Sequence, residues 1–311
     1  MKRFAHDFAG WLWTNVTVGA FGAWLVGEIF RDGSRLTALC LFLPSAAVAL
    51  ALMLTALLAR LCRCRRIAWA AALLWLPPAI SLLFVENQWL RPAPAGEPTR
   101  SLRLVHWNVG GAASGETGLL EALAAQEADI YVLSEYYGEE GAKRLAEGLG
   151  EGFCLFRKRQ LTVFARGPVR LVRREDREPS RAYFALWSSP SGPVQLLLVD
   201  LPSRPVYYRG SLLARVRELM AEHRPDLVVG DFNTTRRSKA LAHLPPGYAH
   251  AYYEAGAGWS ATWPDHFPLW DIDQCILGPR VRPVRYDLVS TGLSDHRMQV
   301  FDFELSEVAG E

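Results

Sequence analysis

The sequence predicts an α/β fold of mixed-sheet architecture, preceded by a membrane domain, and two observations predict it. After residue 100, short runs rich in β-branched residues are separated sometimes by a helical pattern and sometimes by a tight turn. Before residue 90, three apolar stretches follow one another. We therefore expect a membrane domain over 1–88, a linker over 89–100 and a folded domain over 101–311.

The three apolar stretches cover residues 9–27, 36–59 and 67–85, and none contains Asp, Glu, Lys or Arg. A helix needs roughly 20 such residues to cross a bilayer, so we expect three transmembrane helices. Basic residues precede the first stretch and fill the turn RLCRCRR at 60–66, which predicts that both lie in the cytoplasm. The folded domain would then lie outside the cytoplasm, in an integral protein of the inner or plasma membrane.

The segment RPAPAGEPT contains three prolines, which predicts a stiff, extended linker before the folded domain. We expect helices at 116–127 and 210–223, because both have helical periodicity and the second has one apolar face. The mixed-charge segment 170–181 is expected to be a solvated loop. Strands are expected at 102–107, 129–135, 153–157, 161–165, 183–187, 194–200, 226–231, 273–277 and 298–305.

The charge and cysteine content of the folded domain restrict its functions. From residue 101 onward it has 24 Lys and Arg against 27 Asp and Glu, a net charge of −3. A protein that grips long nucleic acid usually has a clearly basic face, which this composition does not favour. Of the five cysteines, only Cys154 and Cys275 fall in this domain, and we expect both to be buried free thiols.

Five short strings end in residues that bind metals or transfer protons, and three of them follow an apolar run directly. Buried strands emerge from a sheet at such positions, where α/β proteins collect their ligands. The strings are LVHWN, ending at Asn108; YVLSE, ending at Glu135; GDFN, with Asp231 and Asn233; LWDIDQCIL, with Asp271 and Asp273; and SDH, with Asp295 and His296.

The residue types in these strings suit the cleavage of a phosphate ester. Mg²⁺ takes oxygen ligands and usually only one or two protein carboxylates, so Glu135 is the expected ligand, with the amide oxygen of Asn108 beside it. Mn²⁺ is the alternative ion. Asp231 can accept a proton from water, and Asn233 can hold the phosphate or the base in register. A histidine such as His296 needs an acidic partner to fix its tautomer.

The order and wording of these strings resemble the endonuclease/exonuclease/phosphatase superfamily over about residues 100–305, with GDFN and SDH as the most specific pieces and ATWP followed by DIDQCIL as support. The resemblance implies a four-layer sandwich of two packed mixed β-sheets flanked by helices. It also implies that Asp231 activates water with Asn233 as companion, and that Asp273 pairs with His296, with Asp271 as the rival. Asp295 would complete the metal or phosphate shell.

The sequence departs from the superfamily pattern at two positions. Asp200 follows VQLLLV where many members have a histidine, and Gly110 stands where some nucleases have an acidic residue. Three alternatives remain for Asp200: it helps to hold a second metal, it pairs with Arg181 or Arg204, or Tyr207 or its neighbour supplies the missing donor.

The function expected from the sequence is a membrane-anchored, divalent-metal-dependent phosphoesterase that uses an activated water. Its substrate would be a nucleic acid or a lipid-linked phosphate, and no protein partner is expected. One alternative is a phosphatase of lipid-linked phosphate or pyrophosphate at the membrane surface. The other is a catalytically degenerate, phosphate-binding scaffold. This alternative remains because Asp200 replaces the histidine that many members of the superfamily have.

Overall fold

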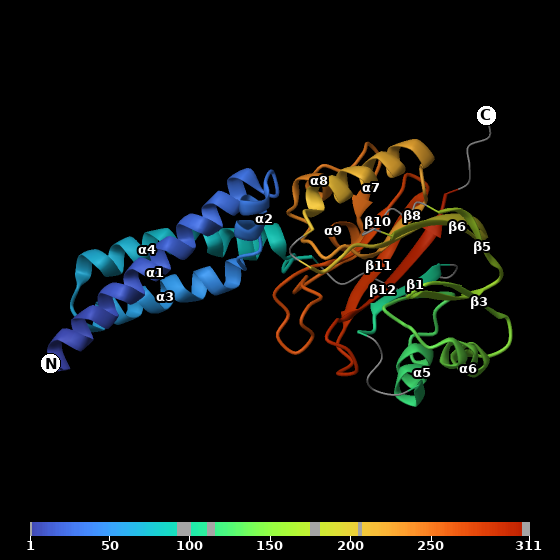
Figure 1. The fold of residues 1–311 in the computed structure, drawn as a ribbon, viewed down its shortest axis with the longest axis horizontal. Helices are drawn as coiled ribbons and strands as arrows, with labels where there is room; N and C mark the ends of the chain where they lie inside the picture. Colours follow the sequence, from blue (N-terminus) through green and yellow to red (C-terminus); the bar gives the residue numbers. More distant parts are fainter. Residues whose placement is uncertain (1, 92–100, 111–115, 175–180, 205–206, 307–311) are drawn as a thin grey trace. The chain divides into compact units, whose positions relative to one another are not determined.

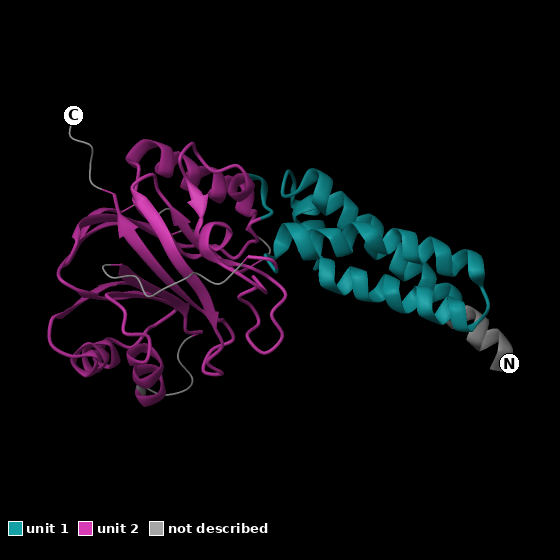
Figure 2. Cartoon of the chain, turned by 180° about the vertical axis from the view of Figure 1, so that it is seen from behind, with its two compact units in different colours: residues 1–89, 237–239 teal, residues 90–236, 240–311 magenta. Residues whose placement is uncertain are grey.

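The computed structural model describes residues 2–91, 101–110, 116–174, 181–204 and 207–306. The chain divides into two compact units, residues 1–89 with 237–239 and residues 90–236 with 240–311 (Figure 2). Most of the predicted linker, residues 92–100, lies outside the described residues, as does the 175–180 part of the predicted loop.

The amino-terminal unit consists of helices. They are α1 (Lys2–Phe30), α2 (Arg35–Leu41), α3 (Ser45–Leu61) and α4 (Arg65–Ile80), the last continuing into the π-helical segment η1 (Ser81–Glu86). Helix α2 begins at a capping box in which Ser34 and Thr37 exchange side-chain and backbone hydrogen bonds. Pro44 precedes α3, where the missing N–H of proline costs no intrahelical bond.

The prediction of three transmembrane helices is not supported. Among the described residues, one helix, Arg65–Glu86, is long and apolar enough to cross a membrane. A second would qualify only if α2 and α3, which are bent by 64° at their junction, formed one span. Helix α1 does not qualify, because tryptophans and polar residues such as Asn15 and Thr17 lower its mean hydropathy.

The helical unit buries several polar side chains beside an apolar cluster, and it exposes many large apolar side chains. The indole N–H of Trp13 donates to Thr55 Oγ1 at 2.8 Å, and that of Trp24 donates to Ser45 Oγ at 2.9 Å. Thr55 and Ser45 are buried. Large apolar side chains are largely exposed instead, among them Leu36, Leu61, Trp69, Leu73 and Phe84. The outer surface of this unit is therefore rich in large apolar side chains.

The second unit contains two six-stranded mixed sheets. The first has the order β11-β12-β1-β2-β4-β3 and the second β5-β6-β7-β8-β10-β9, with the pairs β1/β2 and β7/β8 parallel. The strands are β1 (Leu102–Asn108), β2 (Ile130–Ser134), β3 (Phe153–Lys158), β4 (Leu161–Arg166), β5 (Val169–Arg174), β6 (Arg181–Ser189), β7 (Gly192–Asp200), β8 (Leu227–Asp231), β9 (Ala249–His250), β10 (Asp273–Leu277), β11 (Val281–Val289) and β12 (Met298–Leu305).

Helices cover the outer faces of both sheets. Helices α5 (Glu116–Ala124) and α6 (Glu139–Leu149) share an apolar cluster with one sheet, and α7 (Arg209–His223) and α8 (Lys239–Ala242) share one with the other (Figure 1). The largest cluster, which includes Trp187 and Phe301, joins strands of the two sheets to each other and to the short helix α9 (Ala251–Ala255). The expectation of two packed mixed sheets flanked by helices is thus confirmed.

Several elements of the second unit differ from the expectation. The predicted solvated loop 170–181 is wrong for its first residues, because β5 (Val169–Arg174) pairs with β6 as an edge strand. An edge strand can be exposed on both sides of its pleat, so its arginines face water without interrupting the sheet. Strand β11 was not predicted, because exposed arginines and a proline interrupt its apolar residues. Helix α6 was not predicted either, although its apolar residues, among them Ala142 and Leu145, recur at helical spacing. The short elements α8, β9 and α9 were also not predicted.

Candidate active site

A row of charged residues crosses four neighbouring strands of the second sheet. The Cα partners are Arg181 with Asp200, Asp200 with Asp231, and Asp231 with Asp273. Side chains two residues apart on a strand point to the same face. Residues two positions away from the members of the row, among them Val229, belong to the cluster that joins the two sheets. The row therefore faces the other sheet.

The first sheet contributes Asn108 at the end of β1 and Glu135 directly after β2. The Asn108 amide nitrogen donates to Asp231 Oδ2 at 2.9 Å and to Glu135 Oε1 at 3.3 Å. Its Oδ1 accepts from the Gly110 backbone N–H at 2.9 Å. Asn108 was expected to offer its oxygen to a metal, but here that oxygen serves the backbone and the nitrogen faces the carboxylates.

Asp231 is buried and is held by Asn233. The Asn233 backbone N–H donates to Asp231 Oδ1 at 2.7 Å, and its side-chain nitrogen donates to Asp231 Oδ2 at 2.9 Å. The side chain of Asn233 also donates to the Leu201 carbonyl at 2.8 Å. A φ of +48° allows Asn233 to fold back in this way, a conformation that asparagine tolerates better than most residues. Asn233 thus fixes both oxygens of the carboxylate.

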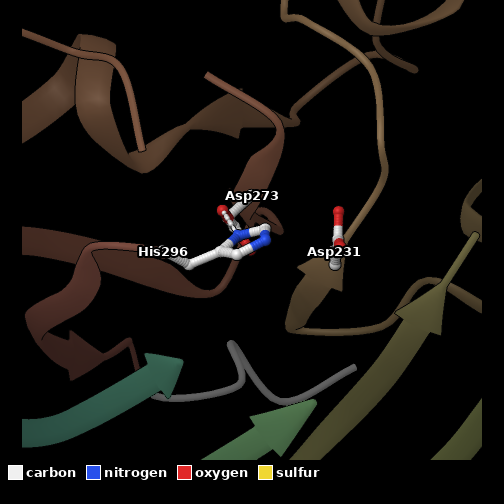
Figure 3. Close-up of side chains that lie close together, drawn as sticks. All are labelled: Asp231, Asp273 and His296. Atoms are coloured by element: carbon white, nitrogen blue, oxygen red, sulfur yellow. Dashed lines mark hydrogen bonds and ion pairs between the residues drawn. The ribbon is translucent and has the colours of Figure 1, made fainter. Parts of the chain in front are cut away.

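His296 pairs with Asp273 and not with Asp271. Its Nδ1 lies 2.8 Å from Asp273 Oδ2, whereas Asp271 Oδ2 lies 2.9 Å from Nε of Arg236. Figure 3 shows the ring of His296 between Asp273 and Asp231. One ligand atom from each of these three residues lies within 4.8 Å of the others. Donation from Nδ1 to Asp273 leaves Nε2 as the ring nitrogen available for another group.

Charge around His296 and the two aspartates shifts all three pKa values. Burial lowers the pKa of His296, but Asp273, Asp231 and Asp295 outweigh it and raise the pKa to about 9. Burial, and next Asp273, raise the pKa of Asp231 well above its ordinary value. Burial also acts to raise the pKa of Asp273, but His296 overcomes this effect and lowers it. The imidazolium of His296 is thus favoured beside an ionised Asp273.

Asp295 and Glu135 border the site. Asp295 Oδ2 accepts from the Trp263 indole N–H at 2.8 Å. A Cβ added to Gly110 would lie 3.1 Å from Asp295 Oδ1, and Gly110 has a φ of +53°. An acidic residue at position 110, as some nucleases have, would therefore crowd Asp295. Glu135 has a φ of +58°, so the chain turns sharply where β2 ends.

Asp200 pairs with Arg181, whose Nη1 lies 3.1 Å from Asp200 Oδ2. Gln160 also donates to Asp200 through its side-chain nitrogen. Burial raises the pKa of Asp200, while Arg181 and Gln160 oppose that rise. Arg204 and Tyr207, the alternatives that the sequence left open, are exposed, and the Tyr207 backbone N–H donates to the Arg204 carbonyl at 3.1 Å.

Sequence reasoning missed four residues that hold the site together. Thr262 Oγ1 accepts from the Asp273 backbone N–H at 3.2 Å, and Ser294 Oγ donates to the Asn108 carbonyl at 2.7 Å. The other two are Trp263 and Gln160, described above. Ser294 lies inside SDH, and Thr262 and Trp263 lie inside ATWP, so the strings themselves could have identified these three. Gln160 has no such signal.

The donor atoms at this edge fit a hard divalent cation. Glu135 and Asp295 offer carboxylate oxygens at the border, and Asp231, Asp273 and His296 form a closer group that could also hold an ion. Asp273 Oδ1 is buried and has no hydrogen-bond partner within the described part of the chain. Carboxylate oxygens are the ligands that Mg²⁺ and Mn²⁺ prefer, so the residues present suit either ion.

Comparisons with known proteins agree with this fold. A family model described as the Endonuclease/Exonuclease/phosphatase family matches residues 105–296. No curated protein matches the chain. TDP2 of D. rerio, complexed with single strand DNA product, is 17% identical with a TM-score of 0.54, over 66% of this chain and 99% of that chain. A mannosyl-6-phosphatase from Bacteroides thetaiotaomicron is 14% identical with a TM-score of 0.54, over 66% and 100%.

Proposed function

Because the chain belongs to the endonuclease/exonuclease/phosphatase family, we propose that it is a divalent-metal-dependent phosphoesterase that attacks phosphorus with an activated water. The observation that carries this proposal is the group of Asp231, Asp273 and His296 at one edge of the sandwich. It combines a proton acceptor and a cationic histidine, two groups that accelerate the hydrolysis of an ester at neutral pH.

Asp231 is the proposed base that takes a proton from the attacking water. Its raised pKa makes the ionised carboxylate a stronger proton acceptor, and donors from Asn108 and Asn233 fix its orientation. His296, held by Asp273, is the proposed contact of a phosphoryl oxygen through Nε2. Because its pKa is about 9, it carries a positive charge at neutral pH and stabilises negative charge in the transition state.

Glu135 and Asp295 are the proposed ligands of Mg²⁺ or Mn²⁺, with Asn108 as a further ligand if its amide turned over. The ion, when bound, neutralises charge on the phosphoryl oxygens. The exposure of Asp295 suits a ligand that leaves room for substrate and water around the ion. Glu135 and Asp295 would thus bind the metal ion at the border of the site, while the buried Asp231, Asp273 and His296 would act on protons and charge.

Anchoring to a membrane by residues 1–88 is the second part of the proposal, with catalysis assigned to residues 101–311. The apolar outer surface of the helical unit and its polar interhelical hydrogen bonds support it, because lipid solvates the first and not the second. We propose that the catalytic unit lies outside the cytoplasm, which rests on the basic turn that contains Arg63 and Arg65.

A phosphorylated lipid is the second candidate substrate, beside nucleic acid. The exposed apolar helical surface favours it, since an anchored enzyme meets substrates in the same membrane. The net charge of −3 for residues 101–311 also makes a long nucleic acid less favourable.

The deciding experiment is an assay of the purified full-length protein on plasmid DNA and on polyprenyl and phospholipid phosphates, with Mg²⁺, with Mn²⁺ and with chelator. The proposal expects turnover of one substrate class that chelator abolishes and added metal restores. Metal binding measured by calorimetry separates an enzyme from a degenerate scaffold, because the scaffold need not bind metal at Glu135. Turnover that persists in chelator would contradict the metal-dependent proposal.

A further inference from the structure

We infer that Arg181 binds a phosphoryl oxygen of the substrate and that Asp200 is the positioning residue that holds it, an inference that rests on the proposed function. Arg181 begins strand β6 and stands at one end of the charged row that runs through Asp200 and Asp231 to Asp273. Adjacent strands lie about 4.8 Å apart, so the Cα atom of Arg181 lies two spacings, roughly 10 Å, from that of Asp231.

The Arg181 side chain reaches Asp200, the residue that separates it from the proposed base along this row. Its Nη1 lies 3.1 Å from Asp200 Oδ2, which places the guanidinium beside the next residue of the row. The side chain is 27% exposed, against 7% for that of Asp200, so the guanidinium reaches solvent while its partner does not. A guanidinium has five N–H donors, and one ion pair leaves others that can bind two phosphate oxygens together.

Asp200 is fixed from both sheets. Gln160, in the turn between β3 and β4 of the first sheet, donates its side-chain nitrogen to Asp200. Its Oε1 accepts from the Tyr137 hydroxyl at 3.1 Å, and its carbonyl accepts from the Tyr136 backbone N–H at 3.0 Å. A carboxylate held in this way cannot swing toward the base, and it holds the guanidinium of Arg181 in one place.

A cation at this position offsets part of the negative charge that the row presents to a phosphate. The carboxylates of Asp200, Asp231 and Asp273 all face the same edge, and each of them repels a phosphate unless a positive group intervenes. The positive charge of His296 offsets the negative charge of Asp273 at one end of the row. Arg181 compensates at the Asp200 end, so a phosphate above Asp231 would lie between two cations.

Arg209 is the rival cation: burial lowers its pKa, and the negative charge of Asp231 opposes that shift. Its Nε donates to the Pro202 carbonyl at 3.0 Å, and its Nη2 donates to the Ser203 carbonyl. These bonds commit the guanidinium of Arg209 to the loop before α7. Arg181 pairs with a carboxylate of the row itself, and its partly exposed guanidinium keeps further N–H donors for a substrate oxygen.

Orthophosphate binding to the full-length protein in detergent, measured by calorimetry with Mg²⁺ and with chelator, tests the inference. We expect Arg181→Gln to weaken binding at least tenfold and Arg181→Lys to retain part of it, because lysine keeps the charge but not the two-pronged geometry. Arg170→Gln removes the same charge from an exposed position on the neighbouring strand β5 and should stay within twofold of wild type. Melting temperatures check that each variant is folded.

Three results would overturn the role of Arg181: binding by Arg181→Gln within twofold of wild type, an equal loss in Arg204→Gln, or no phosphate binding by the wild-type protein in either condition. A protein that binds orthophosphate through Arg181 but hydrolyses no ester contradicts the proposed function and supports this inference. Normal hydrolysis and normal phosphate binding in Arg181→Gln contradict the inference alone.

The positioning role of Asp200 is tested by a double-mutant cycle on the same measurement. Asp200→Asn should weaken phosphate binding in the wild-type background, because Arg181 loses the ion pair that fixes its position. In the Arg181→Gln background it should cause no further weakening, because the guanidinium that Asp200 positions is already absent. An equal weakening in both backgrounds would show that Asp200 acts independently of Arg181 and would overturn its role.

Discussion

Each oxygen of the buried Asp231 carboxylate accepts at least one hydrogen bond, from Asn108 or Asn233, so the group is oriented before any substrate arrives. We expect Asp231→Asn to lower kcat at least a hundredfold, because the amide keeps the shape but cannot accept the proton, and general-base catalysis contributes about 10²–10⁴. Asp226→Asn is the control: it removes a buried carboxylate just before β8 begins. Similar kcat values for the two variants would contradict the assignment of Asp231.

The pair of His296 and Asp273 should make stability depend on pH, measured with chelator present. The His296 pKa is raised from 6.5 to about 9, so the folded state binds the proton more tightly and stability falls as pH rises. Its contribution is full below pH 6.5 and is lost toward pH 9. The lowered pKa of Asp273 acts on the acid side, where its contribution is lost as pH falls below 3.8.

We therefore expect the wild-type melting temperature to exceed that of Asp273→Asn by several degrees near pH 6, and the difference to shrink as pH rises to 9. Asp302→Asn, which breaks the ion pair with Arg103 elsewhere in the first sheet, should show a difference that is constant over this range. A gap between wild type and Asp273→Asn that stays constant from pH 6 to 9 would contradict the charged state of His296.

At the scale of the element, strand β8 depends on a glycine next to the proposed base. A Cβ added to Gly230 would lie 1.8 Å from the Val199 carbonyl oxygen of β7, at a φ of +153°. We expect Gly230→Ala to destabilise the fold by roughly 3 kcal/mol, because the backbone of β7 or β8 must move. Gly192→Ala is the matched control, since Gly192 also has a positive φ, +115°, but nothing within 4 Å. Equal melting temperatures of the two variants would show that close packing is not the cause.

The strands that carry the site could be predicted because they are buried, and a buried strand shows as an apolar run that ends at its polar residue. Asp231 follows such a run in β8, and Asn108 ends one in β1. Strand β11 could not be predicted, because it alternates exposed arginines and a proline with its apolar residues. Apolar periodicity reports burial, and this strand is only partly buried.

Side-chain partners were less predictable than strand positions. The sequence left Arg181 and Arg204 as alternatives to pair with Asp200, and the register of β6 against β7 places Arg181 opposite Asp200. It also led us to expect the Asn108 amide oxygen at the metal, whereas that oxygen accepts from the Gly110 backbone N–H. Gln160 comes from a turn of the other sheet, and no local pattern connects it with Asp200.

At the scale of the whole molecule, the helical unit should hold the protein in a membrane. We expect the full-length chain to remain in the membrane fraction after alkaline washing. Leu73→Asp should reduce that fraction, since Leu73 is 67% exposed on α4 and a central charge costs roughly 3 kcal/mol on insertion. Val172→Asp, at a similarly exposed apolar residue of β5, should leave it unchanged. Full extraction of the wild-type protein by the wash would contradict anchoring.

The hydrogen bond from Asn108 to Asp231 joins the end of a strand in one sheet to the end of a strand in the other. The Asp231 carboxylate therefore keeps its hydrogen bond to Asn108 only while the two sheets remain packed together. In a denaturant titration, enzymatic turnover would disappear no later than the loosening of that contact, even while each sheet kept its own pairing. Residual turnover would then report whether the two sheets are still packed against each other.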